Sequence, residues 1–277
     1  MSEVIAIANQ KGGVGKTTTA VNLGASLAVS EKRTLIIDAD PQANATSHYG
    51  FRRNSYEFNI YDVLRGTKDL RDVVLKTALP NLELAPSNIG LVGLEKELYS
   101  KDYAQKEMIL REKIKPLRDN YDYIIIDTPP TLGLITINAL CAADSVIIPI
   151  QCEYFAMEGL AQLFTTVKMV KNKNPSLRVR GFLPTMFTPN NNLSKQVFSE
   201  LKEHYPSELF PNLAGEDECG DEYIYIPRNV KLAESPSFGK PVILYDVKSV
   251  GSAAYQNLAG AILSGNNPIA TRGAKVG

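Results

Sequence analysis

The chain has 277 residues, and its 30 Lys and Arg residues balance 30 Asp and Glu residues, so the formal net charge is zero. This balance, with a pI near 6.8, excludes a protein-wide positive field, so any nucleic-acid binding has to use a local patch. Three widely spaced cysteines fit neither a disulfide framework nor a tetrahedral metal site, and they favour a reducing compartment. No apolar run approaches the ~20 residues of a membrane span, and the first predicted strand leaves no room for a signal peptide.

The N-terminal stretch predicts a strand, a glycine-rich turn and a helix. Residues 4–8 are apolar and β-branched, and residues 19–28 carry apolar side chains at helical spacing. The turn between them has the order expected of a phosphate-binding loop, whose backbone N–H groups and following helix N-terminus surround phosphate oxygens. It therefore predicts nucleoside triphosphate binding. The predicted ligands are Lys11, Gly12, Gly13, Val14, Gly15, Lys16, Thr17 and Thr18.

Within this loop, Lys16 is placed to reach the β- and γ-phosphates, and the Thr17 hydroxyl can hold Mg²⁺. The general motif wants glycine at the position of Gln10, and a second lysine, Lys11, follows instead. Because one lysine already serves the phosphates of its own subunit, Lys11 is available to another subunit's nucleotide. The alternative for Lys11 is an ordinary solvated surface lysine. A dinucleotide-binding loop is excluded, since it would need glycine at Thr18.

A second buried strand is predicted over residues 33–38, and it leads into Asp38, Asp40 and a proline that ends it. In an open parallel sheet, carboxylates at a strand's carboxyl end lie beside the phosphate loop. One can act through the water shell of the metal, and the other can orient or deprotonate the attacking water. The alternative is a pair of turn-forming aspartates. Residues 44–47 are predicted to continue as a polar loop that senses the γ-phosphate.

A third buried strand is predicted over residues 121–127, ending in Asp127. Apolar residues that end in aspartate form the Walker B arrangement, whose carboxylate contacts Mg²⁺. The proline-rich stretch 128–133 then predicts a stiff loop that responds to the γ-phosphate. Alone this pattern is common, but together with Lys16 and Asp38 it indicates an ATPase site.

The remaining patterns complete an alternation of strands and helices. Strands are predicted at 82–86, 145–150 and 179–186, helices at 60–66, 90–99, 103–118, 156–173, 193–204 and 249–263, and an edge strand or turn at 224–229. We therefore expect an α/β protein with the three-layer P-loop NTPase fold, in which helices cover both faces of a mostly parallel, twisted sheet. One domain is expected over residues 1–264, with a flexible tail at 265–277. Acidic residues 216–222 are predicted to form a surface loop.

Three stretches resemble one known family. They are 11–18 (Lys-Gly-Gly-Val-Gly-Lys-Thr-Thr), 38–44 (Asp-Ala-Asp-Pro-Gln-Ala-Asn) and 127–130 (Asp-Thr-Pro-Pro). With the runs 142–160, 226–237 and 239–241, they closely resemble the ParA/Soj-type chromosome- and plasmid-partitioning ATPases of the deviant Walker A group. The resemblance covers nearly the whole chain.

The resemblance implies a Mg²⁺-dependent ATPase that forms a homodimer around its ATP. It implies that Lys11 reaches across the dimer, that Asp40 serves the hydrolytic water, and that Asp38 and Asp127 lie around the metal with Thr17. Pro227 and Asn229 stand where the family contacts adenine.

The family's cycle implies that the ATP-bound dimer binds DNA without sequence preference. A ParB-type centromere-binding partner then triggers hydrolysis and release. The protein would be cytoplasmic and nucleoid-associated, without a membrane partner. The predicted DNA contacts are Arg228, Lys231, Lys240 and Lys248, with Lys195 and Lys202 as further candidates. Each lysine alone is more often a solvated surface residue than a DNA contact, and residues 188–192 lack charged residues that family members often carry there.

Two other functions share parts of this pattern. A MinD-like membrane-cycling regulator has the same loop but needs a C-terminal amphipathic helix, and residues 264–273 lack its length and periodicity. A reductase component resembling the nitrogenase iron protein needs paired cysteines at a subunit interface, and Cys141 and Cys152 do not have that spacing.

Overall fold

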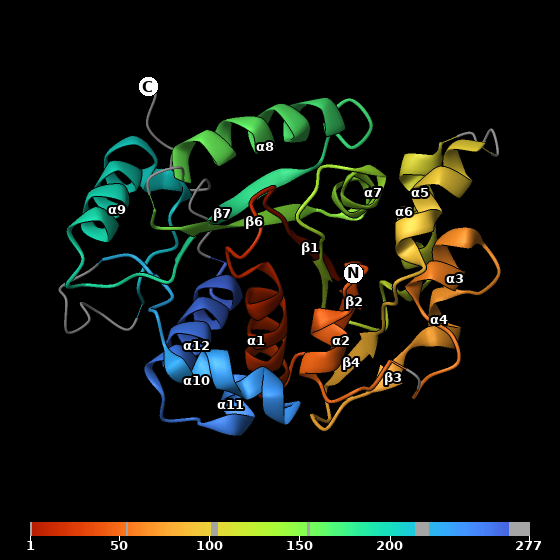
Figure 1. Cartoon of the computed structure of the whole chain (residues 1–277), viewed down its shortest axis with the longest axis horizontal. Coiled ribbons are helices and arrows are strands. Elements are labelled where there is room, and N and C mark those ends of the chain that lie inside the picture. The colour runs from red at the N-terminus through yellow and green to blue at the C-terminus, as the bar shows by residue number, and fades with distance from the viewer. Residues whose placement is uncertain (1, 54, 101–104, 154–155, 214–221, 266–277) are drawn as a thin grey trace.

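The computed structural model describes residues 2–53, 55–100, 105–153, 156–213 and 222–265. Its centre is a seven-stranded sheet in the order β3-β4-β2-β5-β1-β6-β7 (Figure 1). Every pairing is parallel except that of the short edge strand β3 with β4. The strands are β1 Glu3–Ile7, β2 Thr34–Asp38, β3 Leu75–Lys76, β4 Leu82–Ala85, β5 Tyr123–Asp127, β6 Ser145–Gln151 and β7 Arg178–Thr185.

Helices lie on both faces of this sheet (Figure 1). They are α1 Lys16–Val29, α2 Asn44–His48, α3 Ile60–Arg65, α4 Leu70–Val73, α5 Leu91–Ser100, α6 Ile109–Ile114, α7 Leu134–Ala142, α8 Ala156–Val170, α9 Asn192–His204, α10 Val230–Glu234, α11 Val242–Tyr245 and α12 Val250–Leu263. Short 3₁₀ turns lie at Lys106–Met108, Lys115–Leu117, Pro206–Glu208 and Ser235–Phe238 (η4).

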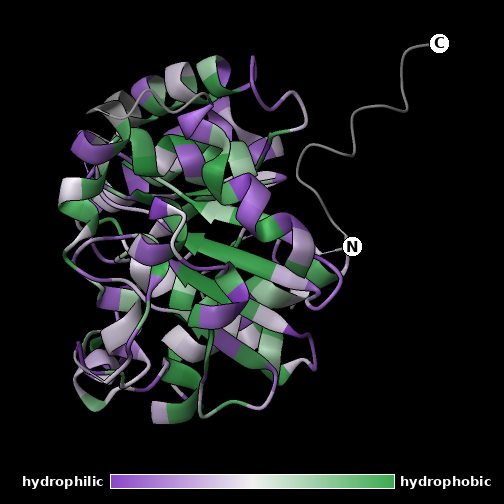
Figure 2. Ribbon diagram, turned by 90° about the vertical axis from the view of Figure 1, so that its right-hand side faces the viewer, coloured by the Kyte–Doolittle hydropathy of each residue, from purple (hydrophilic) through white to green (hydrophobic). Residues whose placement is uncertain are grey.

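Alternation along the central strands creates two cores. In β5, Ile124 and Ile126 face the core under α3 and α5–α9, whereas Ile125 faces the core under α1, α10 and α12. All three side chains are fully buried, because a parallel sheet covered on both faces has no solvated side. Figure 2 accordingly shows apolar strands inside and polar segments at the periphery. The predicted α/β fold class is confirmed.

The structure contains the predicted strands and most of the predicted helices, including those at 60–66, 90–99, 193–204 and 249–263. Strands β1, β2, β4, β5, β6 and β7 lie within a residue or two of their predicted positions. The prediction of a polar loop at 44–47 is wrong, because these residues form helix α2. Residues 224–229 form one isolated bridge, that of Pro227 with Phe187, and no named strand. The acidic stretch, apart from Glu222, and residues 266–277 lie outside the described part, so the tail boundary stays a prediction.

The helix 103–118 is broken into two 3₁₀ turns and α6, and residues 103 and 104 lie outside the described part. None of the described helices combines the length and the hydropathy needed to cross a membrane. Most of the C-terminal stretch on which the membrane-cycling alternative depends also lies beyond residue 265.

The C-terminal segment packs against α1 and α2 beside the sheet. The Tyr255 hydroxyl lies 3.2 Å from the Thr19 hydroxyl, and the backbone N–H of Val242 donates to the Asn22 side chain at 2.8 Å. His48, only 3% exposed at the end of α2, lies with Nε2 3.3 Å from the Ser235 hydroxyl. Burial lowers the pKa of His48 from 6.5 to about 4.

This burial predicts a pH dependence of stability. The unfolded chain binds a proton at His48 near pH 6.5, whereas the folded protein does so only near pH 4, so the free energy of unfolding falls as the pH drops through this window. Across this whole pH window, the protonation of His48 lowers the free energy of unfolding by about 3 kcal/mol. Urea unfolding of the wild type and of His48→Gln between pH 7 and pH 4, at about 25 °C, should give curves that converge at low pH. Parallel curves would contradict a buried neutral His48.

Candidate nucleotide-binding site

The carboxyl ends of three neighbouring strands bring the predicted site together. β1, β5 and β2 pair in parallel, with Asp127 in register with both Ile7 and Asp38. The loop after β1 is the predicted phosphate-binding loop, so it begins beside both carboxylates. The Thr128 hydroxyl donates to the Ile7 carbonyl at 2.8 Å and fixes the point where the loop leaves the sheet.

Two neighbouring strands hold the shape of the loop. The Asn9 side-chain amide donates to the Pro149 carbonyl of β6 at 2.7 Å, and the Thr185 hydroxyl of β7 donates to the Val14 carbonyl at 2.9 Å. Gly13 and Gly15 have φ values of 75° and 86°, the left-handed region that favours glycine. These constraints hold the backbone as a fixed cradle.

The cradle opens onto the N-terminus of α1. No side chain caps this end of the helix, so its first N–H groups are available to an anion. Lys16 is 6% exposed, and its ammonium group donates to the Lys11 carbonyl at 2.9 Å. Burial lowers the pKa of Lys16, and the charges of Asp127 and Asp40 oppose that effect. A positive side chain therefore spans the loop, facing the carboxylates.

Asp38 and Asp127 are both fully buried, but they differ in their partners. One oxygen of Asp38 accepts from the backbone N–H of Asp40 at 3.1 Å, and the other accepts from the N–H and hydroxyl of Thr46 at 2.8 and 2.7 Å. Both carboxylate oxygens of Asp127 lack a hydrogen-bond partner in the described part of the chain. Burial raises the pKa of Asp127 well above its usual range, and the neighbouring Asp38 raises it further.

A buried carboxylate with two unpartnered oxygens is an unfavourable state unless a cation joins it. Asp127 thus fits a hard cation such as Mg²⁺, and Thr17, at the start of α1, supplies a hydroxyl beside it. Asp40 is 6% exposed and accepts from the N–H of Gln42 at 2.9 Å. The structure brings Lys16, Thr17, Asp40 and Asp127 together as the sequence predicts.

A cavity of about 300 Å³ continues from the loop. It is lined by Gly15 and Thr18 on one side and by Pro227 and Asn229 on the other, with Tyr255 below. The Asn229 Oδ1 atom caps α10 by accepting from the Leu232 N–H at 3.2 Å, which leaves its amide nitrogen to a ligand. The cavity has the position and the largely apolar lining suited to a nucleotide base.

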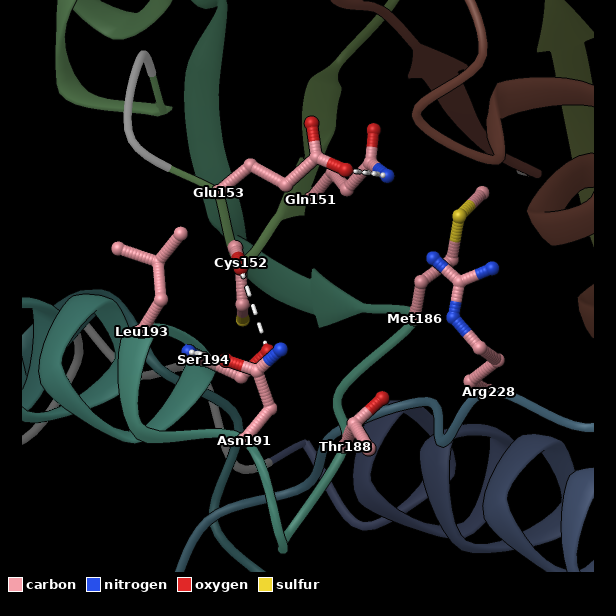
Figure 3. Close-up of a pocket in the computed structure, with 9 residues that line it drawn as sticks. All are labelled: Gln151, Cys152, Glu153, Met186, Thr188, Asn191, Leu193, Ser194 and Arg228. Atoms are coloured by element: carbon pink, nitrogen blue, oxygen red, sulfur yellow. Dashed lines mark hydrogen bonds between the residues drawn. The ribbon is translucent and has the colours of Figure 1, made fainter.

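A second cavity, of about 400 Å³, lies beyond the ends of β6 and β7 (Figure 3). On its rim the Lys11 ammonium forms an ion pair with Glu153 at 3.0 Å, with both side chains partly exposed. Gln151 donates to the other oxygen of Glu153 at 2.6 Å. Cys152, at the back of the cavity, and Cys141 are buried and free, unlike the accessible ligands of a bridging cluster.

The predicted DNA contacts do not form one group. Lys231, Lys240 and Lys248 lie on the segment around α10–α12, and Lys231 pairs with Glu234 at 3.0 Å. Arg228 lines both cavities instead. Lys195 and Lys202 lie on α9, which Figure 1 shows apart from α10 and α11.

Comparison with known proteins identifies the family. A family model described as an AAA domain matches residues 2–179. The chromosome partitioning protein ParA of Myxococcus xanthus is 45% identical over 273 residues, covering 98% of this chain and 92% of that protein. The sporulation initiation inhibitor protein Soj of Bacillus subtilis is 47% identical over 260 residues, covering 94% and 97%. The chain belongs to the ParA/Soj family of chromosome-partitioning ATPases.

Solved structures agree on the fold of this ParA/Soj family member. Cobyrinic acid a,c-diamide synthase of Mycobacterium smegmatis, with bound ATP analogue and magnesium, superposes with a TM-score of 0.79 at 32% identity and covers 95% of each chain. Because the synthase carries a different name and activity, the shared fold alone does not decide partitioning. The more similar ParA and Soj sequences decide the family.

Sequence reasoning missed the side chains that hold this site in place. Thr46, Glu153 and Thr185 contact Asp38, Lys11 and Val14, respectively. No local pattern marks them, since each acts on a residue that only the fold brings near. The one available signal was the threonine six residues after Asp40.

The two unpartnered oxygens of Asp127 predict a specific response to substitution. Asp127→Asn replaces a carboxyl group whose charged form burial disfavours with a neutral amide, so the ligand-free protein should be at least as stable as the wild type, whereas its Mg²⁺ dependence of ATP binding should weaken on the order of tenfold or more. Thermal unfolding and ATP titrations at several Mg²⁺ concentrations measure both effects. An unchanged Mg²⁺ dependence would remove Asp127 from the metal site.

Proposed function

We propose that this protein is a DNA-partitioning ATPase that dimerises on ATP, binds DNA without sequence preference and is released by hydrolysis. One observation carries the nucleotide half of the proposal: a rigid glycine loop and the uncapped end of α1 face a buried carboxylate with no partner of its own. That combination suits a Mg²⁺-bound triphosphate, and the related synthase was crystallised with an ATP analogue and magnesium.

Mg²⁺ would be held by Asp127 and Thr17, with its remaining ligands from phosphate and water. In the described part of the chain, no three acidic, His or Cys side chains form a complete metal site, and Mg²⁺ commonly uses only one or two protein carboxylates. When bound, the ion offsets the negative charge of the phosphates. Lys16 would serve the β- and γ-phosphates, for which it must leave the Lys11 carbonyl.

Asp40 would orient the attacking water and accept its proton. Its carboxylate is nearly buried at the end of β2, on the same sheet edge as the phosphate loop. A backbone bond from Gln42 to Asp40 Oδ1 leaves the second oxygen of the carboxylate for water. Pro227 and the Asn229 amide would contact adenine in the cavity beside the loop.

Lys11 would serve a partner subunit's nucleotide. Within one subunit its ammonium points to Glu153 on the rim of the second cavity, while Lys16 already occupies the loop. An ion pair this exposed contributes about 0–1 kcal/mol, so a triphosphate presented by a second subunit can displace Glu153 at little cost. The dimer would thereby depend on the charge of the intact triphosphate.

This role predicts different effects for the two members of the ion pair. Lys11→Ala should retain ATP affinity within about threefold, since Lys16 is untouched, but lose ATP-dependent dimerisation. Glu153→Gln should strengthen dimerisation, because it frees Lys11. Sedimentation with ATP and Mg²⁺ measures both. An ATP-dependent dimer of Lys11→Ala would refute the assignment.

DNA binding would use the lysines beside α10–α12. Lys240 and Lys248 are exposed and have no ion pair among the described residues, whereas Lys231 is partly neutralised by Glu234. A dimer doubles the patch, and neutralising phosphates releases counterions. Nucleoid association would follow from this contact, and a ParB-type protein would trigger hydrolysis and release.

The deciding experiment compares DNA retention with ATP and with ADP, alongside anionic lipid vesicles. The wild type should bind DNA with ATP only and leave the vesicles free. Lys240→Glu/Lys248→Glu should weaken retention at least tenfold and lower the salt slope by about two, at unchanged ATP affinity.

The matched control is Lys168→Glu/Lys171→Glu, because these exposed lysines make the same charge change at the C-terminal end of α8 and just beyond it, across the sheet. If both double variants lost DNA retention equally, the loss would come from the change in net charge and not from a contact at Lys240 or Lys248. Binding to vesicles in place of DNA would favour the membrane-cycling function.

A further inference from the structure

A buried series of hydrogen bonds joins Asp38, the last residue of β2, and Asp40, two residues beyond it, to the end of β4. β4 pairs in parallel with β2, Ile37 lying in register with Ala85, so the residues after each strand meet at the same sheet edge. Ser87, two residues beyond β4, lies there fully buried. Its backbone N–H donates to the Thr46 hydroxyl at 3.0 Å, and its own hydroxyl donates to the Asp40 carbonyl at 2.7 Å.

The direction of every bond in this chain is fixed by chemistry. The Ser87 N–H can only donate, and the ionised Asp38 carboxylate can only accept. The Thr46 hydroxyl therefore accepts from Ser87 and gives its single proton to Asp38, at 2.7 Å. The Asp40 carbonyl can only accept, so the Ser87 hydroxyl has one orientation as well. With Asp38 ionised, no alternative arrangement of protons satisfies these groups.

Together these hydrogen bonds hold the turn from Asp38 to Asp40 at both its side chain and its backbone. Thr46 holds the side chain of Asp38 through two donors, and Ser87 holds the backbone of Asp40, while the Asp40 N–H closes the ring onto Asp38. Thr46 and Ser87 are 1% and 0% exposed, so water does not compete for these bonds. A carboxylate that has to aim at an attacking water needs its backbone and neighbour fixed to within about half an ångström.

We propose that Thr46 and Ser87 are positioning residues for ATP hydrolysis, which hold Asp40 in the geometry that the attacking water requires. The inference rests on the proposed role of Asp40. Neither residue lines the cavity beside the phosphate loop, so their contribution falls on the rate of hydrolysis and not on the affinity for ATP. Displacing a catalytic group by about 1 Å can lower the reaction rate ~10²-fold.

The test measures kcat and KM for ATP hydrolysis, together with ATP affinity. Thr46→Val keeps the shape of the side chain but removes the hydroxyl, and it should lower kcat about 10²-fold with KM within about twofold. Ser87→Ala should lower kcat about tenfold, because only one bond to Asp40 is lost. Thr46→Ser retains the hydroxyl and should restore kcat to within about threefold of the wild type.

A matched variant separates positioning from stability. Thr34 is also fully buried on β2, and its hydroxyl donates to the Lys32 carbonyl at 2.9 Å, at the end of the strand far from the site. Thr34→Val should keep the wild-type kcat. If Thr34→Val and Thr46→Val lower kcat equally, or if Thr46→Val hydrolyses ATP at the wild-type rate, the inference is wrong.

Two further variants keep the outcomes distinct. The effects of Thr46→Val and Ser87→Ala should be less than multiplicative when combined, since both loosen the same turn; fully multiplicative effects would contradict a shared role in holding this turn. Asp40→Ala, in the same assay, tests the underlying role. If Asp40→Ala hydrolyses ATP normally, the proposed role of Asp40 fails. If Asp40→Ala is inactive while Thr46→Val is not slowed, only the proposed positioning role fails.

Discussion

Buried negative charge beside the phosphate loop is the constraint on which this molecule depends. Asp38 and Asp127 lie in register at the ends of adjacent strands, both without exposed surface, and burial raises the pKa of each, that of Asp38 to about 6. Lys16 is the nearby cation, and it lies largely buried itself. Burying a carboxylate without a partner raises the free energy of the folded protein. A bound divalent cation would offset that cost, because its charge compensates for the charge of the carboxylates.

Asp38 and Asp127 differ in how far hydrogen bonds compensate for their burial. Asp38 is surrounded by donors from Asp40 and Thr46, and these bonds oppose the effect of burial on its pKa. Asp127 has no hydrogen-bonded partner within the described residues. Because all its hydrogen bonds are made within the protein, the Asp38 carboxylate stiffens the turn that carries Asp40. The Asp127 carboxylate, without such bonds in the described part of the chain, remains available to a ligand. In the proposed mechanism, neighbouring strands would therefore carry different tasks, with Asp38 positioning the turn and Asp127 binding the cation.

Local sequence determines much of this arrangement. The apolar runs that end in Asp38 and Asp127, and the glycines between β1 and α1, act through their own backbone, so their pattern predicted strands, loop and carboxylates together. Helix α2 was predicted as a loop, because Asn, Thr, Ser and His are poor helix formers in isolation. Its stability comes from Tyr49, Ala45 and His48, which pack against α1 and η4, and from the bonds of Thr46 to Asp38.

The positions that sequence reasoning missed share one property. Ser87 is 47 residues from Asp40, Glu153 is 142 residues from Lys11, and Thr185 is 171 residues from Val14. A one-dimensional pattern carries information about neighbours three or four residues apart, and parallel β–α–β connections bring together residues that are much further apart. The sequence therefore predicted the loop, the lysines and the carboxylates of the candidate site, but not the side chains that hold them in place.

Lys11 shows how the side chains that hold the loop in place would affect the proposed response to ATP. Its backbone carbonyl is fixed by Lys16 and its N–H by Asn9, so the main chain of the loop is held while the side chain is free to turn. Within the described residues, that side chain is restrained only by an exposed contact with Glu153, which contributes about 1 kcal/mol at most. A triphosphate bound between two subunits, as proposed above, would offer several charges where Glu153 offers one, so a rigid loop with one weakly held lysine would suit a response to ATP.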